Sequence, residues 1–284
     1  MPNVTQKDSA LPASRIDEKN IAFWDELCGT KQARQLGVTD SSPMSLERFD
    51  AWYFELYPYL FDHVRLQELV GRDVLEIGLG YGSLSQKIAE SGARYVGLDI
   101  AAGPVQMVRH RLRQAGLSGR AERGSVAGAP FPDESFDCVI TIGCLHHTGD
   151  MGRAIAECRR MLRPGGSLVA MVYYAYSYRR WMQARRQTLK YMWSEMSGYR
   201  GVAAPESERE RWIYDHNSEG LAAPHTDFVS VKSLRYLCRD FSKFQWRRRN
   251  IDQEPPFRTR SRNALLKTRW PSLCGLEIYA TAIK

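Results

Sequence analysis

The segment Val74-Leu-Glu-Ile-Gly-Leu-Gly-Tyr-Gly-Ser-Leu84 constrains the fold more than any other part of this 284-residue chain. Its short apolar run predicts a buried strand, which leads directly into three glycines spaced two residues apart, Gly78, Gly80 and Gly82. Glycines at such a point let the backbone take positive φ angles and approach a ligand closely. A helical pattern follows, so the segment predicts a strand, a ligand-binding loop and a helix.

The same alternation of strand and helix patterns continues along the chain. Helical patterns cover 84–90, 105–115 and 151–162, and strand patterns cover 74–78, 95–99, 120–126, 137–142, 167–174, 244–251 and 276–283. Repeated alternation is typical of a parallel sheet covered on both faces. We therefore predict an α/β fold: a Rossmann-like, seven-stranded, mostly parallel sheet with helices on both faces.

Two segments outside this pattern are rich in aromatic residues and predict additions to the sheet. The first is helical in pattern and covers about 16–70, and the second covers 173–214. We predict four parts: an N-terminal helical extension or lid (1–69), a ligand-binding core (70–175), an inserted substrate lid (176–228), and a C-terminal helix and last strands that complete the sheet (229–284). Most of these aromatic rings are expected in the cores of the added helices, and some in a substrate pocket.

Two acidic residues indicate which ligand the glycine loop binds. Glu76 stands just before the loop, and Asp99 ends the next strand, where a carboxylate can accept the hydroxyls of a ribose. A dinucleotide site has the pattern G-x-G-x-x-G, which brings helix amides to a pyrophosphate, whereas this chain has Ser83 after its third glycine. Glu76 would also repel a phosphate. The pattern favours a nucleoside ligand with positive charge, and S-adenosylmethionine has an ammonium and a sulfonium.

This residue set resembles the class I S-adenosylmethionine-dependent methyltransferases over about residues 70–175. The order Gly143-Cys-Leu-His-His-Thr-Gly-Asp150, a helix and then Arg163-Pro-Gly-Gly166 is similar to the subgroup of quinone, sterol and natural-product enzymes. The resemblance implies S-adenosylmethionine as cofactor and S-adenosylhomocysteine as product. It also implies a set of cofactor-binding positions: Glu76, Gly78, Gly80 and Gly82 at the methionine half, Asp99 at the ribose, Ile100, Ser125 and Val126 at the adenine, and the Gly143 carbonyl near the ammonium.

The adenine position departs from the pattern of many relatives. Those relatives carry an aspartate that takes the adenine amino group, whereas this chain has Ser125 there. A serine hydroxyl is a weaker acceptor, so we expect backbone groups to contribute to adenine binding.

Methyl transfer is an in-line displacement that requires an aligned nucleophile and, for a hydroxyl acceptor, a base. His146 and His147 follow the fourth strand beside the expected cofactor, and one of them is the candidate base. Adjacent residues point in different directions, so the other would pack or cap. The expected substrate-binding residues are aromatic or histidine residues of the two added segments and of the end of the fifth strand: Trp24, Tyr53, Tyr173, Tyr174, His216 and His225.

Composition narrows the remaining alternatives. The six cysteines have no metal-ligand spacing, and we expect no metal site. No apolar run is long enough to span a membrane, and the N-terminus has no signal-peptide pattern, so a cytoplasmic location is expected.

The net charge of +8 is concentrated in two basic clusters, at 179–190 and 247–269. Such clusters suit an anionic small-molecule acceptor or, as an alternative, an RNA or DNA methyltransferase. The segment after the fourth strand lacks an Asn/Asp-Pro-Pro-Tyr/Phe motif, which would resemble enzymes that methylate the amino groups of nucleic-acid bases. Its absence favours a small-molecule acceptor. A non-catalytic partner subunit and a homo-oligomeric state are left open.

Overall fold

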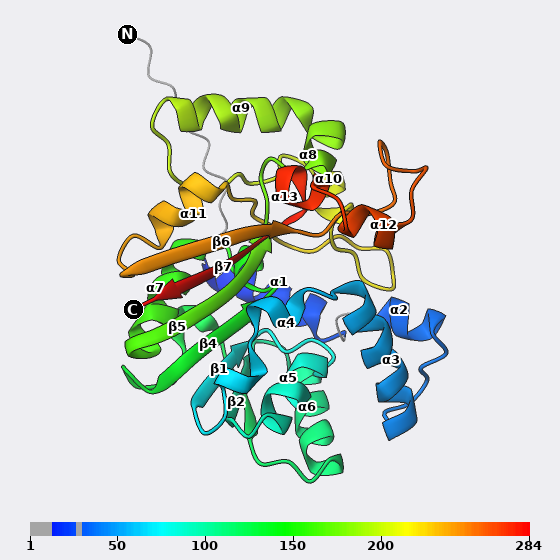
Figure 1. Ribbon diagram of the computed structural model, residues 1–284, viewed down its shortest axis with the longest axis vertical. Helices are drawn as coiled ribbons and strands as arrows, with labels where there is room; N and C mark the ends of the chain where they lie inside the picture. Colours follow the sequence, from blue (N-terminus) through cyan, green and yellow to red (C-terminus); the bar gives the residue numbers. More distant parts are fainter. Residues whose placement is uncertain (1–12, 27–29) are drawn as a thin grey trace.

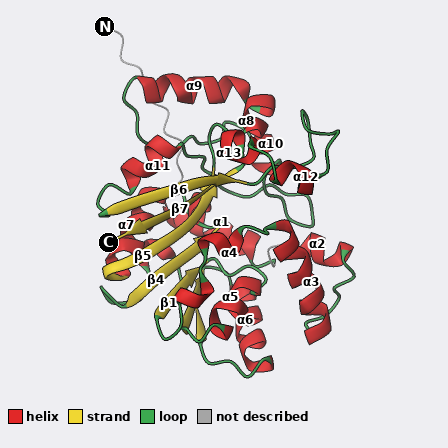
Figure 2. Cartoon of the chain, viewed as in Figure 1, coloured by secondary structure: helices red, strands yellow, loops and turns green. Residues whose placement is uncertain are grey.

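The computed structural model describes residues 13–26 and 30–284. Residues 1–12 and 27–29 of the predicted N-terminal extension lie outside the described part. Seven strands form one sheet in the order β3-β2-β1-β4-β5-β7-β6 (Figures 1 and 2). Strands β1 to β5 pair in parallel, and β7 runs antiparallel to both β5 and β6. The predicted Rossmann-like, mostly parallel seven-stranded fold is therefore confirmed.

The strands fall close to their predicted positions. Their bounds are β1 Asp73–Ile77, β2 Arg94–Asp99, β3 Arg120–Arg123, β4 Phe136–Ile142, β5 Leu162–Tyr173, β6 Lys243–Arg249 and β7 Glu277–Ile283. Strand β3 ends earlier than predicted because Ser125 turns the chain: its hydroxyl oxygen accepts the Ala127 N–H at 3.3 Å and caps the 3₁₀ turn η2, Val126–Gly128.

Helices cover both faces of the sheet. Helices α5 (Ser83–Glu90) and α6 (Ala102–Gln114) pack on one face. Helices α7 (Met151–Met161) and α11 (Val231–Leu237) pack on the other. Ser230 caps α11, since its hydroxyl oxygen accepts the Ser233 N–H at 3.0 Å.

Residues 30–56 lie at the end toward which the parallel strands point, whereas residues 185–196 extend back over α11 (Figure 1). The N-terminal part forms α1 (Ala13–Trp24), α2 (Thr30–Gln35), α3 (Pro43–Leu56), α4 (Leu60–His63) and the 3₁₀ turn η1 (Leu66–Glu68). The segment after β5 forms α8 (Tyr178–Gln183), α9 (Arg185–Met196) and α10 (Glu208–Trp212). Two short helices, α12 (Arg262–Leu266) and α13 (Trp270–Cys274), precede β7. None of the described helices is both long and apolar enough to cross a membrane.

A buried ion pair fixes α3 to the glycine loop. The Arg111 guanidinium on α6 donates to both Asp50 carboxylate oxygens, at 2.9 and 2.8 Å, and to the Tyr81 carbonyl at 2.7 Å. The Ser83 hydroxyl donates to Asp50 at 2.5 Å. A buried arginine must be paired to be tolerated, and here its partners come from both the core and the extension. The extension is therefore held against the start of α5.

Candidate active site

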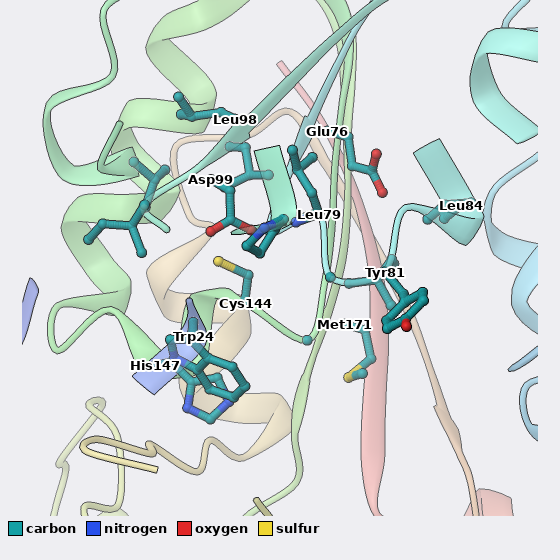
Figure 3. A pocket seen from close by; sticks show the side chains of 18 of the residues that line it. Trp24, Glu76, Leu79, Tyr81, Leu84, Leu98, Asp99, Cys144, His147 and Met171 are labelled. Carbon is teal, nitrogen blue, oxygen red and sulfur yellow. Dashed lines mark hydrogen bonds between the residues drawn. The ribbon is translucent and has the colours of Figure 1, made fainter. Parts of the chain in front are cut away.

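A cavity of about 260 Å³ opens at the carboxyl edge of the sheet. It runs from the glycine loop and the end of β2, past the end of β4, to the added helices. Figure 3 shows Glu76 and Asp99 at one part of the cavity and the overlapping rings of Trp24 and His147 at another, with Cys144 between them. Ligands bind at this edge in open α/β sheets, where the loops after successive strands converge.

The glycine loop has the backbone geometry that the sequence predicts. Gly78, Gly80 and Gly82 have φ angles of 82°, 51° and 78°, in the left-handed region that disfavours side chains. A Cβ atom at Gly78 would lie 2.5 Å from the Cys144 Cβ, so the loop after β1 and the loop after β4 can approach each other only with glycine there. This close approach shapes the middle of the cavity.

Asp99 is held in place by backbone amides. One carboxylate oxygen accepts the Leu79 N–H at 2.8 Å and the other accepts the Ala101 N–H at 2.9 Å. Burial raises the pKa of Asp99, and these amide donors oppose that effect. Each carboxylate oxygen has a second acceptor position, so the pair can still accept both hydroxyls of a ribose.

Glu76 lies beneath the loop. One of its carboxylate oxygens accepts hydrogen bonds from the hydroxyls of Ser85 and Tyr95, both at 2.6 Å. Burial raises the pKa of Glu76 to about 7 despite these donors. Its other oxygen remains for a ligand.

The charge of the cavity lining contrasts with the basic character of the chain. Among the described residues, the lining holds four carboxylates, Asp17, Glu76, Asp99 and Asp215, one histidine, His147, and neither lysine nor arginine. A site of this charge disfavours phosphates and favours a cationic ligand. The donor set therefore fits S-adenosylmethionine, which has two cationic groups and no phosphate.

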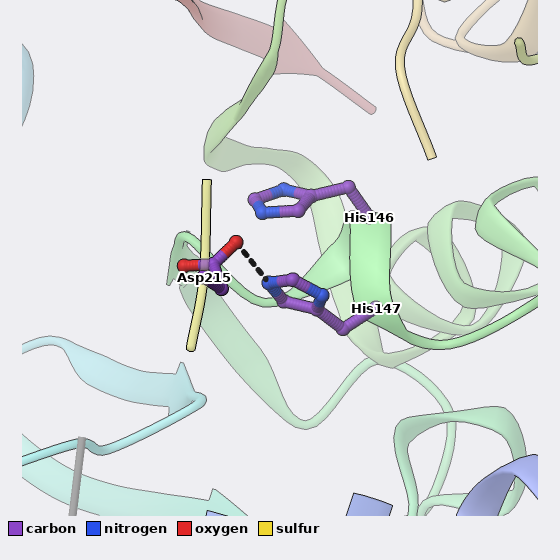
Figure 4. A group of neighbouring side chains, drawn as sticks. All are labelled: His146, His147 and Asp215. Carbon is purple, nitrogen blue, oxygen red and sulfur yellow. Dashed lines mark ion pairs between the residues drawn. The ribbon is translucent and has the colours of Figure 1, made fainter. Parts of the chain in front are cut away.

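His147 lies at the opposite part of the cavity in a defined tautomer. Its Nδ1 is 2.6 Å from the His225 carbonyl oxygen, which can only accept, so Nδ1 carries the proton. Its Nε2 faces Asp215 Oδ2 at 3.6 Å (Figure 4). The Tyr173 hydroxyl donates to the other Asp215 oxygen at 3.0 Å. Burial lowers the pKa of His147, whereas the Asp215 charge raises it.

His146 does not share this position. Its ring lies on the Tyr173 ring with 4.0 Å between centroids, is fully buried, and is absent from the cavity lining. Burial holds the pKa of His146 well below its usual range. The structure thus separates the two predicted candidates, and only His147 faces the cavity.

The remaining predicted site residues divide into two groups. Most lie in the cavity lining: Trp24, Tyr53, Glu76, Gly78, Gly80, Asp99, Ile100, Ser125, Val126, Gly143 and Tyr173. Four others do not line it, for specific structural reasons. Gly82 starts α5 against Arg111, and Tyr174 points to the other sheet face because side chains alternate along β5. His216 stacks on Trp212 at 4.4 Å, and His225 contacts His147 through its backbone carbonyl while its ring lies outside the lining.

Sequence reasoning missed several lining residues, notably Asp17, Asn20, Trp52, Tyr57 and Asp215. Asp17, Asn20 and Trp24 are spaced three and four residues apart on α1, which places them on one helix face. That spacing is readable in the sequence, but it does not say which element the face covers. Asp215 adjoins His216, so the right segment was identified with the wrong side chain.

Several arginines of the two basic clusters contact other residues of the fold. Arg179 pairs with Glu254 at 2.5 Å, the buried Arg180 lies over the Phe228 ring, and Arg249 lies 3.5 Å from Asp62. Arg248 donates to the Leu273 carbonyl at 2.9 Å and lies over the Tyr174 ring. No arginine or lysine of either basic cluster lines the cavity in the part of the chain that the structure describes.

One group of side chains also has the chemistry of a metal site. His146, His147 and Asp215 each offer a ligand atom, and these atoms lie within 4.8 Å of one another. Histidine nitrogens and carboxylate oxygens bind divalent metals, but they also form proton-transfer pairs. The expectation of no metal stays a prediction that chelation can test.

The sequence of this chain is similar to those of known methyltransferases. Residues 75–170 match the sequence profile of a family described as "Methyltransferase domain". The chain is 33% identical over 100 residues to a demethylmenaquinone methyltransferase of Tropheryma whipplei, covering 35% of this chain and 41% of the relative. It is 34% identical over 116 residues to a ubiquinone biosynthesis O-methyltransferase of Hahella chejuensis, covering 40% and 49%. These matches span less than half the length of the relatives.

Solved structures extend the likeness of fold beyond the matched segment. A S-adenosylmethionine-dependent methyltransferase from Methanosarcina mazei has a TM-score of 0.52 at 18% identity, covering 81% of this chain and 98% of that one. One from Mesorhizobium loti has a TM-score of 0.52 at 17% identity, covering 79% and 97%. These structures share the fold of this chain. Residues 75–170 thus match a methyltransferase domain, and they lie within a Rossmann-like fold that solved S-adenosylmethionine-dependent methyltransferases share.

Proposed function

We propose that the protein transfers a methyl group from S-adenosylmethionine to an uncharged small molecule that bears an ionisable hydroxyl. The observation that carries this proposal is the cavity lining: carboxylates at the cofactor part, aromatic rings at the other part, and no described lysine or arginine. An anionic acceptor would need a cationic side chain there. The basic clusters, which suggested such an acceptor, do not supply one.

Aromatic side chains from several elements line the cavity. Helix α3 contributes Phe49, Trp52 and Tyr53, Tyr57 follows it, and β5 contributes Tyr173. Such rings bury a largely apolar molecule and exclude water. The names of the relatives support this class, since they refer to demethylmenaquinone, to ubiquinone biosynthesis and, for a Mycobacterium ulcerans enzyme, to phthiotriol and phenolphthiotriol dimycocerosates.

His147 and Asp215 would take the proton of the acceptor hydroxyl. The cofactor supplies an electrophilic methyl carbon with a sulfonium leaving group. Glu76 and Asp99 would hold this cofactor, His147 Nε2 would take the proton of the acceptor hydroxyl, and the acceptor oxygen would receive the methyl group as the cofactor leaves as S-adenosylhomocysteine. Asp215, held by the Tyr173 hydroxyl, would stabilise the imidazolium that forms. The proton on Nδ1, directed to the His225 carbonyl, leaves Nε2 as the acceptor atom.

The experiment that tests the proposal uses the full-length protein with methyl-labelled S-adenosylmethionine and a host-cell extract. The extract is divided into nucleic-acid, protein and small-molecule fractions, and the last includes the material soluble in organic solvent. Label in the small-molecule fraction is expected, and mass spectrometry of the product would identify the methylated atom. Label confined to nucleic acid or protein, or binding of cofactor without transfer to any fraction, would overturn the proposal.

A further inference from the structure

The nucleobase part of the cavity contains a carboxylate that comes from a distant segment. Ser125 and Val126 line this part from the core, and Asp17 lines it from α1. Burial raises the pKa of Asp17, and hydrogen bonding with the Ser125 hydroxyl opposes that effect. The core segment has no acidic side chain at this point, so Asp17 adds what residues 124–126 lack.

Helix α1 is fixed to the core by contacts on both sides of Asp17. The Asp25 carboxylate accepts the N–H groups of Ala102 and Gly103, at 3.0 and 2.9 Å, and so caps the start of α6. The Asn20 amide donates to the His147 carbonyl at 2.8 Å. Ile16 lies so close to Gly149 that a Cβ there would be 2.5 Å from its Cδ1. The position of Asp17 is therefore set by the core and not by the rest of the extension.

The order of groups along the cavity shows what lies next to Asp17. Asp99 marks the ribose, and His147 marks the part where the methyl group must meet its acceptor. In S-adenosylmethionine the ribose separates the sulfonium from the adenine. The adenine must then extend from Asp99 in the direction away from His147, toward Ile100, Ser125 and Asp17.

We propose that Asp17 accepts a hydrogen bond from the exocyclic amino group of the adenine, so that α1 forms part of the cofactor site. A carboxylate has about four acceptor positions, and one hydroxyl donor leaves room for the amino group. The inference rests on the proposed use of S-adenosylmethionine. It goes beyond that proposal because it assigns base recognition to a residue outside the methyltransferase domain match, which begins at residue 75.

The test measures the binding of two ligands to full-length protein by isothermal titration calorimetry. One is S-adenosylhomocysteine, and the other is its analogue in which hydrogen replaces the adenine amino group. A hydrogen bond to a charged group contributes about 1.5–3 kcal/mol, and a partly exposed one contributes less. We expect the wild type to prefer S-adenosylhomocysteine roughly tenfold, since 1.4 kcal/mol corresponds to tenfold. In Asp17→Ala this preference should fall to about threefold or less, and Asp17→Asn, which keeps an acceptor oxygen, should retain an intermediate preference.

Glu18→Gln is the matched control, because Glu18 is exposed on the same helix and does not line the cavity. It should leave both affinities unchanged. Equal weakening of both ligands by Asp17→Ala would show that Asp17 only supports the helix, and unchanged affinities would show no role; either result overturns the inference. A wild-type protein that binds neither ligand would instead refute the use of this cofactor, so the two failures are distinguishable.

Discussion

The two parts of the cavity are built in different ways. The cofactor part comes largely from one continuous stretch, residues 76–144, in which backbone amides hold Asp99 and the hydroxyls of Ser85 and Tyr95 hold Glu76. The acceptor part is assembled from α1, α3, the end of β5 and the inserted segment, which meet only in the folded chain. Its polar core, His147, Asp215 and Tyr173, is held by side-chain contacts and one carbonyl.

This difference limits which residue roles can be assigned from the domain match alone. The matched segment ends at residue 170, so it contains His147 but neither Tyr173 nor Asp215. Most of the elements that we propose bind the acceptor lie outside it. Substitutions in one part should therefore change cofactor affinity, and substitutions in the other should change turnover, and the following experiments test that separation.

The largest effect is expected for His147→Ala. Loss of a positioned base typically costs about 10²–10⁴-fold in rate. We expect kcat to fall in that range while calorimetric affinity for S-adenosylhomocysteine stays within about threefold, because the cofactor part is unchanged. His216→Ala is the control, since the half-buried His216 stacks on Trp212 outside the cavity lining. Full activity of His147→Ala would remove the base assignment, and a large loss of cofactor affinity would mean that the two parts are not separable.

Asp99→Ala should instead weaken cofactor binding and leave turnover at saturating cofactor nearly unchanged. Loss of two charge-assisted hydrogen bonds to the ribose should weaken cofactor binding by about tenfold or more, with little change in the acceptor KM at saturating cofactor. Asp99 also accepts two backbone amides, so Asp99→Asn is measured beside it to separate ribose contacts from loop support. Asp133→Ala, an exposed carboxylate outside the lining, serves as the control. Wild-type affinity in both Asp99 variants would disprove the ribose assignment.

Asp215→Asn should have a smaller effect, which is a shift of the acidic limb of the kcat profile. His147 accepts a proton only when neutral, so kcat should fall as the pH drops through its pKa. Burial lowers this pKa and the Asp215 charge raises it, while the His225 ring lowers it and Asp227 raises it. Removal of the Asp215 charge should therefore move the acidic limb of the profile to lower pH and reduce the plateau, because the imidazolium loses its partner. A limb that stays in place would show that Asp215 and His147 do not act as a pair.

Chelation should have no effect. If His147 and Asp215 form a proton-accepting pair, activity measured after extensive dialysis against EDTA should equal that of untreated protein. Loss of activity that added Zn²⁺ or Mg²⁺ restores, together with loss of metal binding in His146→Ala, would assign the group of His146, His147 and Asp215 to a metal ion instead. That result would give the acceptor part a second kind of chemistry.

The sequence was sufficient for the features that local pattern determines. The alternation of strands and helices, the glycine loop and Asp99 lie where the pattern predicts them, because each depends on residues within a few positions of one another. Pairs that join distant segments could not be predicted. Asp50 with Arg111, Asp215 with His147 and Asp17 with Ser125 each depend on how the added helices pack on the sheet edge.

Tyr174, His216 and His225 were predicted to bind substrate but do not line the cavity, because the local pattern does not determine where a side chain points. Each lies in a segment that does reach the cavity, yet the direction of the side chain depends on strand register or on a local stacking partner. For His146 and His147 the sequence indicated that one of two adjacent rings would face the site. The carbonyl of His225 and the ring of Tyr173 determine which one, and neither is visible in a local pattern.

The anchoring of α1 has a consequence for the construction of chimeric enzymes. Its contacts, through Ile16, Asn20 and Asp25, go to the sheet-edge loops and to α6. A chimera that takes the acceptor specificity of another enzyme should therefore exchange residues 30–63 and 176–228 but keep the native residues 13–26 and also Asp50, which pairs with the buried Arg111. The native part of such a chimera would thus include α1, although the chain reaches the first strand only some fifty residues later.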